Sequence, residues 1–84
     1  MNDQFVVLSS LAMDLKRAAS AFWRGSTGVA QRFLDESLER KEEVDLKRVD
    51  SHIVNILEDI KTNKDAEDLL MYSTLIQNYV RKNE

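Results

Sequence analysis

The stretch Gly25-Ser26-Thr27-Gly28 holds both glycines of this 84-residue chain, which contains no proline and no cysteine. Glycine and proline are the residues that most often interrupt helices and mark loops. Because both are absent everywhere else, the sequence predicts a chain that is helical nearly throughout, with one firm break at residues 25–28. The expected fold class is therefore all-α.

On both sides of this break, apolar residues recur every three or four positions, which is the spacing of a helix face. Before the break, Asn2 or Asp3 can cap a first helix and Gly25 can end it as a C′ residue. After it, Ser26 or Thr27 can cap a second helix. The apolar face of the first helix consists of Leu8, Leu11, Leu15, Ala18 and Phe22.

The boundary between the second and third helices has no glycine or proline, so the phase of the apolar residues locates it. One apolar seam consists of Leu46, Val49, Ile53, Ile56 and Ile60. Continued backwards it meets charged residues, which a straight helix over residues 29–61 would bury at high cost. We therefore expect a turn near residues 43–45, with Asp45 as N-cap and Val44 packing on Val49. The alternative is three helices, one of them a long bent helix over 29–61.

A polar segment, Thr62-Asn63-Lys64-Asp65, precedes a fourth helix whose first turn is acidic and whose last turn is basic, as the helix dipole favours. The sequence thus predicts one domain, residues 1–84, with helices at about 3–24, 28–42, 46–61 and 65–82. Short connections favour antiparallel neighbours. The expected architecture is a small four-helix up-down antiparallel bundle.

Charge is distributed unevenly along the chain, whose net charge is −3. Residues 1–33 carry four basic and two acidic side chains, whereas residues 34–84 carry eight and thirteen. Such a bipolar chain favours head-to-tail or antiparallel association. No run of Lys and Arg exceeds two residues, so we expect no nucleic-acid partner.

Targeting and membrane signals are weak in this sequence. No apolar segment is long enough to span a membrane, and we expect no membrane partner. The apolar stretch over residues 5–13 follows Asp3, where a signal peptide would carry basic residues. We therefore expect a cytoplasmic protein.

The only histidine, His52, is the first place to look for catalysis. The residues after it, Ile53 and Val54, do not match the Lys-Gly pair usual in histidine phosphotransfer domains. Arg48 lies four positions earlier, where a helix would give the two side chains one face for cleaving phosphodiesters. Nothing else in the sequence supports such a site. We therefore expect no enzyme, no cofactor and no metal site, with phosphotransfer or phosphodiester chemistry at Arg48 and His52 as the least favoured alternative.

Two surfaces are candidates for binding a protein. The first consists of Phe22, Trp23 and Arg24. Neighbouring helix residues point about 100° apart, so Trp23 lies at the rim if Phe22 lies in the core. Tryptophan and arginine are enriched in the energetic centres of protein interfaces. A purely structural interpretation, in which Trp23 covers the end of the bundle, is equally simple.

The second surface is the acidic stretch over residues 35–45, with Asp35, Glu36, Glu39 and Glu43 as the candidate residues. Like charges four positions apart destabilise a helix slightly. Their presence is compatible with a basic partner, although an ordinary solvated face explains them more simply.

These observations predict a non-catalytic helical protein–protein interaction module that self-associates, as a homodimer, and acts as a small adaptor or regulatory protein. The alternative is an acidic inhibitor or immunity-like protein that neutralises a basic enzyme. Arg24 and Arg32 flank residues 25–28, where backbone N–H groups could hold an anion. Helix capping alone explains that stretch.

Overall fold

The computed structural model describes residues 3–63 and 65–83, and these are helical nearly throughout. It contains the helices α1 (Asp3–Trp23), α2 (Thr27–Lys41), α3 (Ser51–Asp59) and α4 (Ala66–Asn83), with a 3₁₀ turn η1 (Leu46–Arg48) before α3. The predicted all-α fold of four helices is confirmed. The alternative of one long bent helix over 29–61 is wrong, because the α2 helix ends at Lys41. The predicted cap at Asn2 lies outside the described residues.

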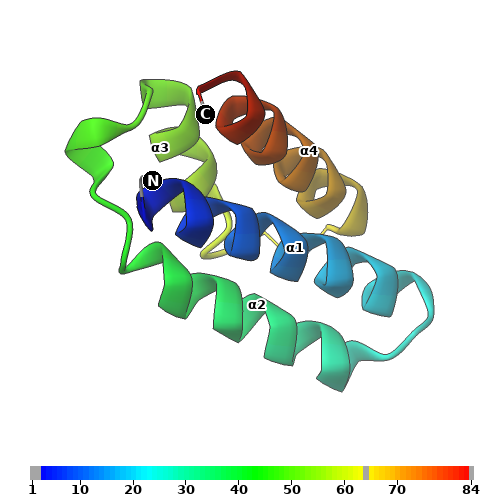
Figure 1. Cartoon of the computed structure of the whole chain (residues 1–84). Helices are drawn as coiled ribbons and strands as arrows, with labels where there is room; N and C mark the ends of the chain where they lie inside the picture. Colours follow the sequence, from blue (N-terminus) through cyan, green and yellow to red (C-terminus); the bar gives the residue numbers. More distant parts are fainter. Residues whose placement is uncertain (1–2, 64, 84) are drawn as a thin grey trace.

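Helix α1 lies between α2 and α4, each of which runs antiparallel to it (Figure 1). The short α3 lies at the end of the molecule where α1 begins and α4 finishes (Figure 1). Ring contacts join these three elements: Tyr79 of α4 meets Phe5 of α1 with 6.3 Å between ring centroids and His52 of α3 with 5.9 Å. One aromatic side chain therefore closes this end of the bundle.

The core follows the predicted helix faces. The central leucines of α1 are completely buried, and they meet apolar residues of every other helix. Ser73 lies at the centre of the inner face of α4, where its Oγ donates a 2.7 Å hydrogen bond to the Ala12 carbonyl oxygen. The fully buried large apolar side chains among the described residues are Leu8, Leu11, Leu15, Ile53, Leu57, Ile60, Leu69 and Ile76.

The turn between α1 and α2 forms because Gly25 adopts a left-handed backbone, with φ of +78°. Its N–H donates to the Phe22 carbonyl oxygen at 3.0 Å, and the Ser26 N–H donates to the Ala21 carbonyl oxygen at 2.8 Å. This is the bond pattern of a Schellman motif. Ser26 then occupies the N-cap position of α2, although its side chain makes no capping hydrogen bond.

The third helix is shorter than the prediction of 46–61. The Asp45 side chain accepts a 3.0 Å hydrogen bond from the Lys47 N–H and so caps η1 instead of a long helix. Val49 is extended, with φ of −121° and ψ of 156°, and α3 begins only after Asp50. A β-branched valine favours extended backbone, and aspartate favours the N-cap position. Asp50 occupies the N-cap position of α3, although its side chain makes no capping hydrogen bond, and its carbonyl oxygen accepts from the N–H groups of Ile53 and Val54.

The start of α4 agrees with the predicted cap. The Asp65 carboxylate accepts hydrogen bonds from the N–H groups of Glu67 at 2.9 Å and Asp68 at 3.4 Å. Asn63 and Asp68 also bond to each other at 2.9 Å, which ties the preceding turn to the first turn of the helix. No helix among the described residues combines the length and the apolar character needed to cross a membrane.

Candidate functional site

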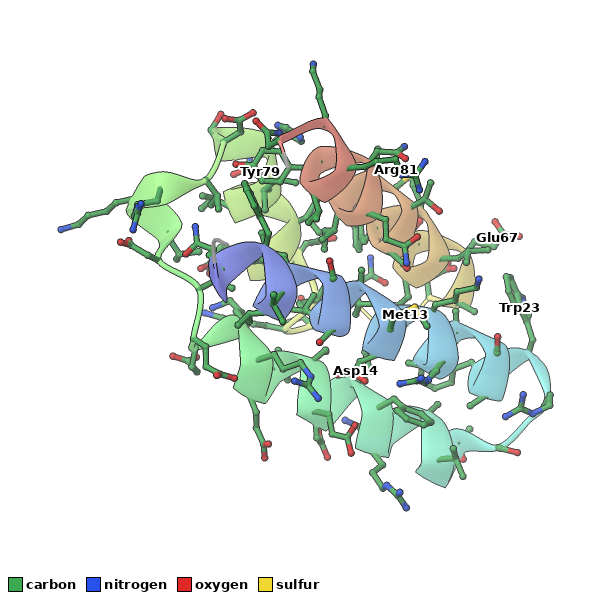
Figure 2. All side chains as sticks on the ribbon, in the orientation of Figure 1. Met13, Asp14, Trp23, Glu67, Tyr79 and Arg81 are labelled. Atoms are coloured by element: carbon green, nitrogen blue, oxygen red, sulfur yellow. The ribbon has the colours of Figure 1, made fainter. Side chains whose placement is uncertain are left out.

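Trp23 is the most exposed large apolar side chain described, with 57% of its surface accessible. It is the last residue of α1, so the turn at Gly25 sets its position. Its neighbour Phe22 packs against the core instead. Figure 2 shows Trp23 at the same end of the molecule as Glu67, near the start of α4. The tryptophan therefore stands at the rim, outside the packed interior.

A hollow of about 440 Å³ lies along α1 and reaches Arg24, the residue that follows Trp23. Arg24, the one residue of this lining that the sequence analysis selected, borders it at the end nearest Trp23. Three of the lining side chains are cationic, two are apolar and one is a serine. We call this surface the basic hollow, and its residues are Met13, Lys16, Arg17, Ser20 and Arg24 of α1 with Phe33 of α2.

The three cationic side chains of the basic hollow differ in whether they interact with other residues. The Arg17 guanidinium lies 5.9 Å from the centre of the Phe33 ring and 3.7 Å from an Asp14 carboxylate oxygen. The side chains of Lys16 and Arg24 make no hydrogen bond or ion pair with any described residue. Two of the three cations therefore face solvent with no partner within the described part of the chain.

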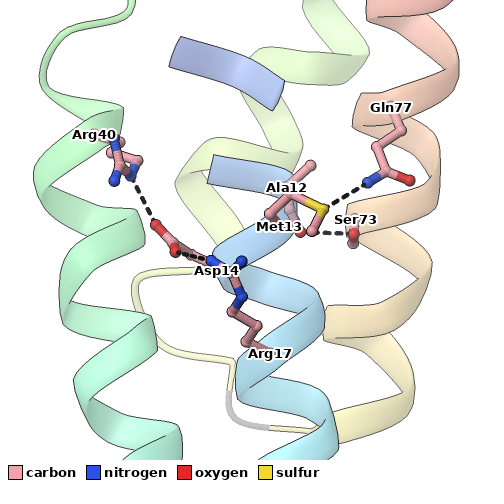
Figure 3. A network of polar contacts seen from close by, with 7 residues as sticks. All are labelled: Ala12, Met13, Asp14, Arg17, Arg40, Ser73 and Gln77. Atoms are coloured by element: carbon pink, nitrogen blue, oxygen red, sulfur yellow. Dashed lines mark hydrogen bonds and ion pairs between the residues drawn. The ribbon is translucent and has the colours of Figure 1, made fainter. Parts of the chain in front are cut away.

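Beneath this surface, Asp14 is buried, with only 2% of its surface accessible. Its Oδ2 accepts a 2.8 Å hydrogen bond from Nε of Arg40, and this bond raises the pKa of Arg40 above its ordinary value. Figure 3 shows Asp14 pointing from α1 toward Arg40 of α2, with Arg17 on the same carboxylate. The buried negative charge is thus matched by cations on both helices, and the pair fixes α1 to α2.

On the other side of α1, Met13 belongs to a second hollow, of about 340 Å³, which also includes Ser9, Gln77, Val80 and Arg81. The Gln77 side-chain amide donates to the Met13 sulfur at 3.6 Å (Figure 3). Met13 lines both hollows and is 39% exposed. A flexible, polarisable methionine at such a junction can adapt to the shape of a partner.

The predicted acidic residues lie on α2 and just beyond it. Asp35 and Glu39 are exposed on α2, Glu36 is half-buried, and Glu43 is exposed in the turn that follows. Asp35 accepts a 3.0 Å hydrogen bond from Gln31. The carboxylates of Glu36 and Glu43 add to the rise in the pKa of Arg40, although less than Asp14 does. Glu36 lies four positions before Arg40 and so shares its face of α2.

The two predicted surfaces are not brought together within one molecule. Trp23 and Arg24 lie at the turn end of the α1–α2 pair, whereas Glu39 and Glu43 lie at its far end. The 15 residues of α2 that separate these ends rise about 22 Å along the helix axis. Opposite charges therefore occupy opposite ends of this helix pair.

The expected shared helix face of Arg48 and His52 is wrong. Arg48 ends η1, extended Val49 follows, and His52 belongs to α3. The His52 ring instead packs edge-on against Tyr79. Within residues 3–63 and 65–83, no three side chains of His, Asp or Glu lie close enough to hold a metal ion together.

The polar contacts around the end of α3 connect helices. Lys41, which is buried, pairs with Glu58 at 3.7 Å, and Lys61 pairs with the same carboxylate at 3.1 Å. The bond with Lys61 is the main cause that lowers the pKa of Glu58. The Tyr72 hydroxyl donates to Asp59, which raises the pKa of Tyr72 and lowers that of Asp59. These groups attach α3 to α2 and α4.

Most of the basic hollow was missed in the sequence analysis. The signal was present in α1, where Met13, Lys16, Arg17, Ser20 and Arg24 follow the three-four spacing of one helix face. The contribution of Phe33 depends on how α2 packs, so no local pattern gives it.

Comparisons of this chain with protein-family models, curated proteins and solved structures found no match.

Proposed function

We propose that this chain is a non-catalytic helical interaction module that associates with itself and acts as a small adaptor or regulatory protein. The observation that carries the proposal is the exposed Trp23 at the end of α1, whose chain neighbour Arg24 lines the basic hollow. Apolar and cationic groups adjoin there on one rigid helix, α1. Aromatic and arginine side chains in this combination are typical of the energetic centres of interfaces.

The energy available from Trp23 is sufficient to matter. A tryptophan offers up to about 250 Å² of surface. With 57% of it accessible, complete burial against a partner would contribute up to about 3.5 kcal/mol at about 25 cal/mol per Å². That is the size of contribution expected from a central interface residue.

Light scattering behind size exclusion, over a wide range of protein concentration, tests this proposal. We expect the mass to rise above the 9.7 kDa of one chain. Trp23→Ala should return the mass to that of a monomer, whereas Met71→Ala should not. Met71 is a matched control because it is also about half exposed, at 49%, but lies on α4. The fluorescence of Trp23, the only tryptophan, should shift to the blue as the protein associates.

A mass of one chain at every concentration would contradict self-association. It would favour the second candidate, an acidic inhibitor-like protein with a basic partner. The observation behind that candidate is that Asp35, Glu39 and Glu43 are exposed without a cation bonded to any of them among the described residues. Reversing Glu36, Glu39 and Glu43 to lysine would then abolish capture of the partner.

A further inference from the structure

We propose that the basic hollow of one copy receives the acidic end of α2 from a second copy, in a two-fold symmetric antiparallel dimer. The acidic end of α2 is defined as Asp35, Glu36, Glu39 and Glu43. This inference rests on the proposed self-association and names the two surfaces that meet in it.

The first reason to pair these two surfaces is that both carry charged side chains without a partner. Lys16 and Arg24 in the basic hollow, and Glu39 and Glu43 in the acidic end, make no side-chain hydrogen bond or ion pair with any described residue. The charged groups between them are already used, since Arg40 of α2 bonds to Asp14 of α1. Two surfaces of opposite sign therefore remain available, separated by an ion pair that is satisfied internally.

Their arrangement on the α1–α2 pair is the second reason. The basic hollow is lined by residues of the second half of α1, beside the turn at Gly25, and by Phe33 of α2, whereas Glu39 lies near the far end of α2 and Glu43 just beyond it. Glu36 lies four positions before Arg40, on the same face of α2, and Arg40 reaches across to α1. Along this helix pair, the unpaired cations Lys16 and Arg24 therefore lie toward the turn, and the unpaired carboxylates of Glu39 and Glu43 lie toward the far end.

Symmetry then selects the orientation of the second copy. A two-fold axis perpendicular to the helices, lying in the plane between the copies, sets each basic hollow opposite the acidic end of the partner. A parallel arrangement would set like charges against each other, which is strongly unfavourable. The antiparallel contact is made twice per dimer and closes on itself, so it does not propagate into a filament.

The size of the face formed by α1 and α2 limits the affinity of the proposed dimer. Two adjacent helices, each about 10 Å wide and side by side over the roughly 22 Å length of α2, present a face that is small for a stable interface. Charge at the edge of an interface contributes more to orientation and association rate than to affinity. We therefore expect a dissociation constant of about 1–100 μM at low salt.

Charge reversal with mutual rescue is the test. One variant carries Lys16→Glu and Arg24→Glu, and a second carries Glu39→Lys and Glu43→Lys. A control variant carries Lys47→Glu and Lys82→Glu, which change the net charge as the first variant does but lie on η1 and α4. Circular dichroism verifies that all three remain helical, and sedimentation equilibrium gives each dissociation constant.

Each of the first two variants alone should raise the dissociation constant by about 100-fold, because like charges then face each other at both contacts. The control should change it by less than about threefold. Mixing the two variants should restore a heterodimer, since both contacts again join opposite charges. Raising the salt from about 50 mM to about 500 mM NaCl should weaken the wild-type dimer.

The outcomes separate this inference from the proposal beneath it. If Trp23→Ala abolishes the dimer while both charge variants leave it intact, self-association stands and the charge pairing is overturned. If only the hollow variant weakens association and mixing does not rescue it, the hollow binds something other than α2, and the pairing is again overturned. A wild-type protein that never associates overturns both.

Discussion

Replacing each glycine by alanine tests whether the Schellman ending of α1 sets the break in the chain. Gly25 has φ of +78°, and a Cβ added there would meet no atom within 4 Å. Alanine at this position therefore bears only the intrinsic cost of left-handed backbone, about 1–2 kcal/mol. It also restricts the unfolded chain, which offsets about 0.4–1 kcal/mol. Gly25→Ala should lower the free energy of unfolding by about 1 kcal/mol.

Gly28 is the matched control, three residues away. It lies in the first turn of α2, and a Cβ added there also meets nothing within 4 Å. Because this backbone is helical, alanine removes the entropic disadvantage of glycine without strain. Gly28→Ala should raise the free energy of unfolding by about 0.5 kcal/mol. The two substitutions, chemically identical, should have opposite signs.

Urea unfolding followed by circular dichroism measures both changes, and thermal melts give a second reading. In a domain of this size, Gly25→Ala should lower Tm by about 4–8 °C and Gly28→Ala should raise it by about 2–4 °C. Gly25→Asn should lie between wild type and Gly25→Ala, since asparagine tolerates the left-handed region. If Gly25→Ala unfolds at the wild-type urea concentration or above it, the left-handed turn does not stabilise this fold.

Further predictions concern polar contacts between helices. Arg40→Ala should lower the free energy of unfolding by about 2 kcal/mol because it leaves the Asp14 carboxylate buried. Asp14→Ala should lower it by only about 1 kcal/mol because the Arg40 side chain is 41% exposed and can turn to water. Urea titrations that give the reverse order would refute this reasoning. Ser73→Ala should lose about 1 kcal/mol in the same assay, since it removes the buried 2.7 Å bond to α1. The bond from Tyr72 to Asp59 should stabilise the fold fully between the ordinary pKa values of 3.8 for Asp59 and 10.0 for Tyr72. This contribution is lost as pH falls through the lowered pKa of Asp59 or rises through the raised pKa of Tyr72. Stability measured against pH should therefore be flatter at both extremes for Tyr72→Phe, and an unchanged profile would contradict the assignment.

Local rules were sufficient for much of the fold. Gly25 ends a helix because glycine adopts positive φ without steric strain. Asp65 begins a helix because its carboxylate accepts hydrogen bonds from backbone N–H groups of the first turn. The three-four spacing of leucines located the buried face of α1. Each of these features depends on residues within a few positions of one another.

The start of the third helix could not be predicted from local sequence in the same way. Asp45 and Asp50 are both suitable caps, and propensity does not choose between them. Leu46 and Val49 pack against the core in the structure, and most residues of that core are distant in the sequence. Tertiary packing therefore determines which aspartate precedes the third helix.

The buried ion pair between Asp14 and Arg40 could not be predicted from the sequence for a related reason. Asp14 lies at the edge of the apolar face of α1, and its partner Arg40 is 26 positions away. Periodicity shows which side a residue faces but does not show what meets it there. The basic hollow has the same character, since α1 supplies most of its lining and the fold supplies Phe33.

The central position of α1 also orders the events of folding. The Asp14–Arg40 pair closes 26 positions, whereas the bond between Ser73 and Ala12 closes 61. The entropy lost on closing a loop grows with its length, so the α1–α2 hairpin should form first and α4 should dock later. Substitutions at Asp14 should then act mainly on the folding rate and those at Ser73 mainly on the unfolding rate. Until α4 arrives, the leucine-rich side of α1 stays open to water, and it is in that interval that the chain is most exposed to aggregation.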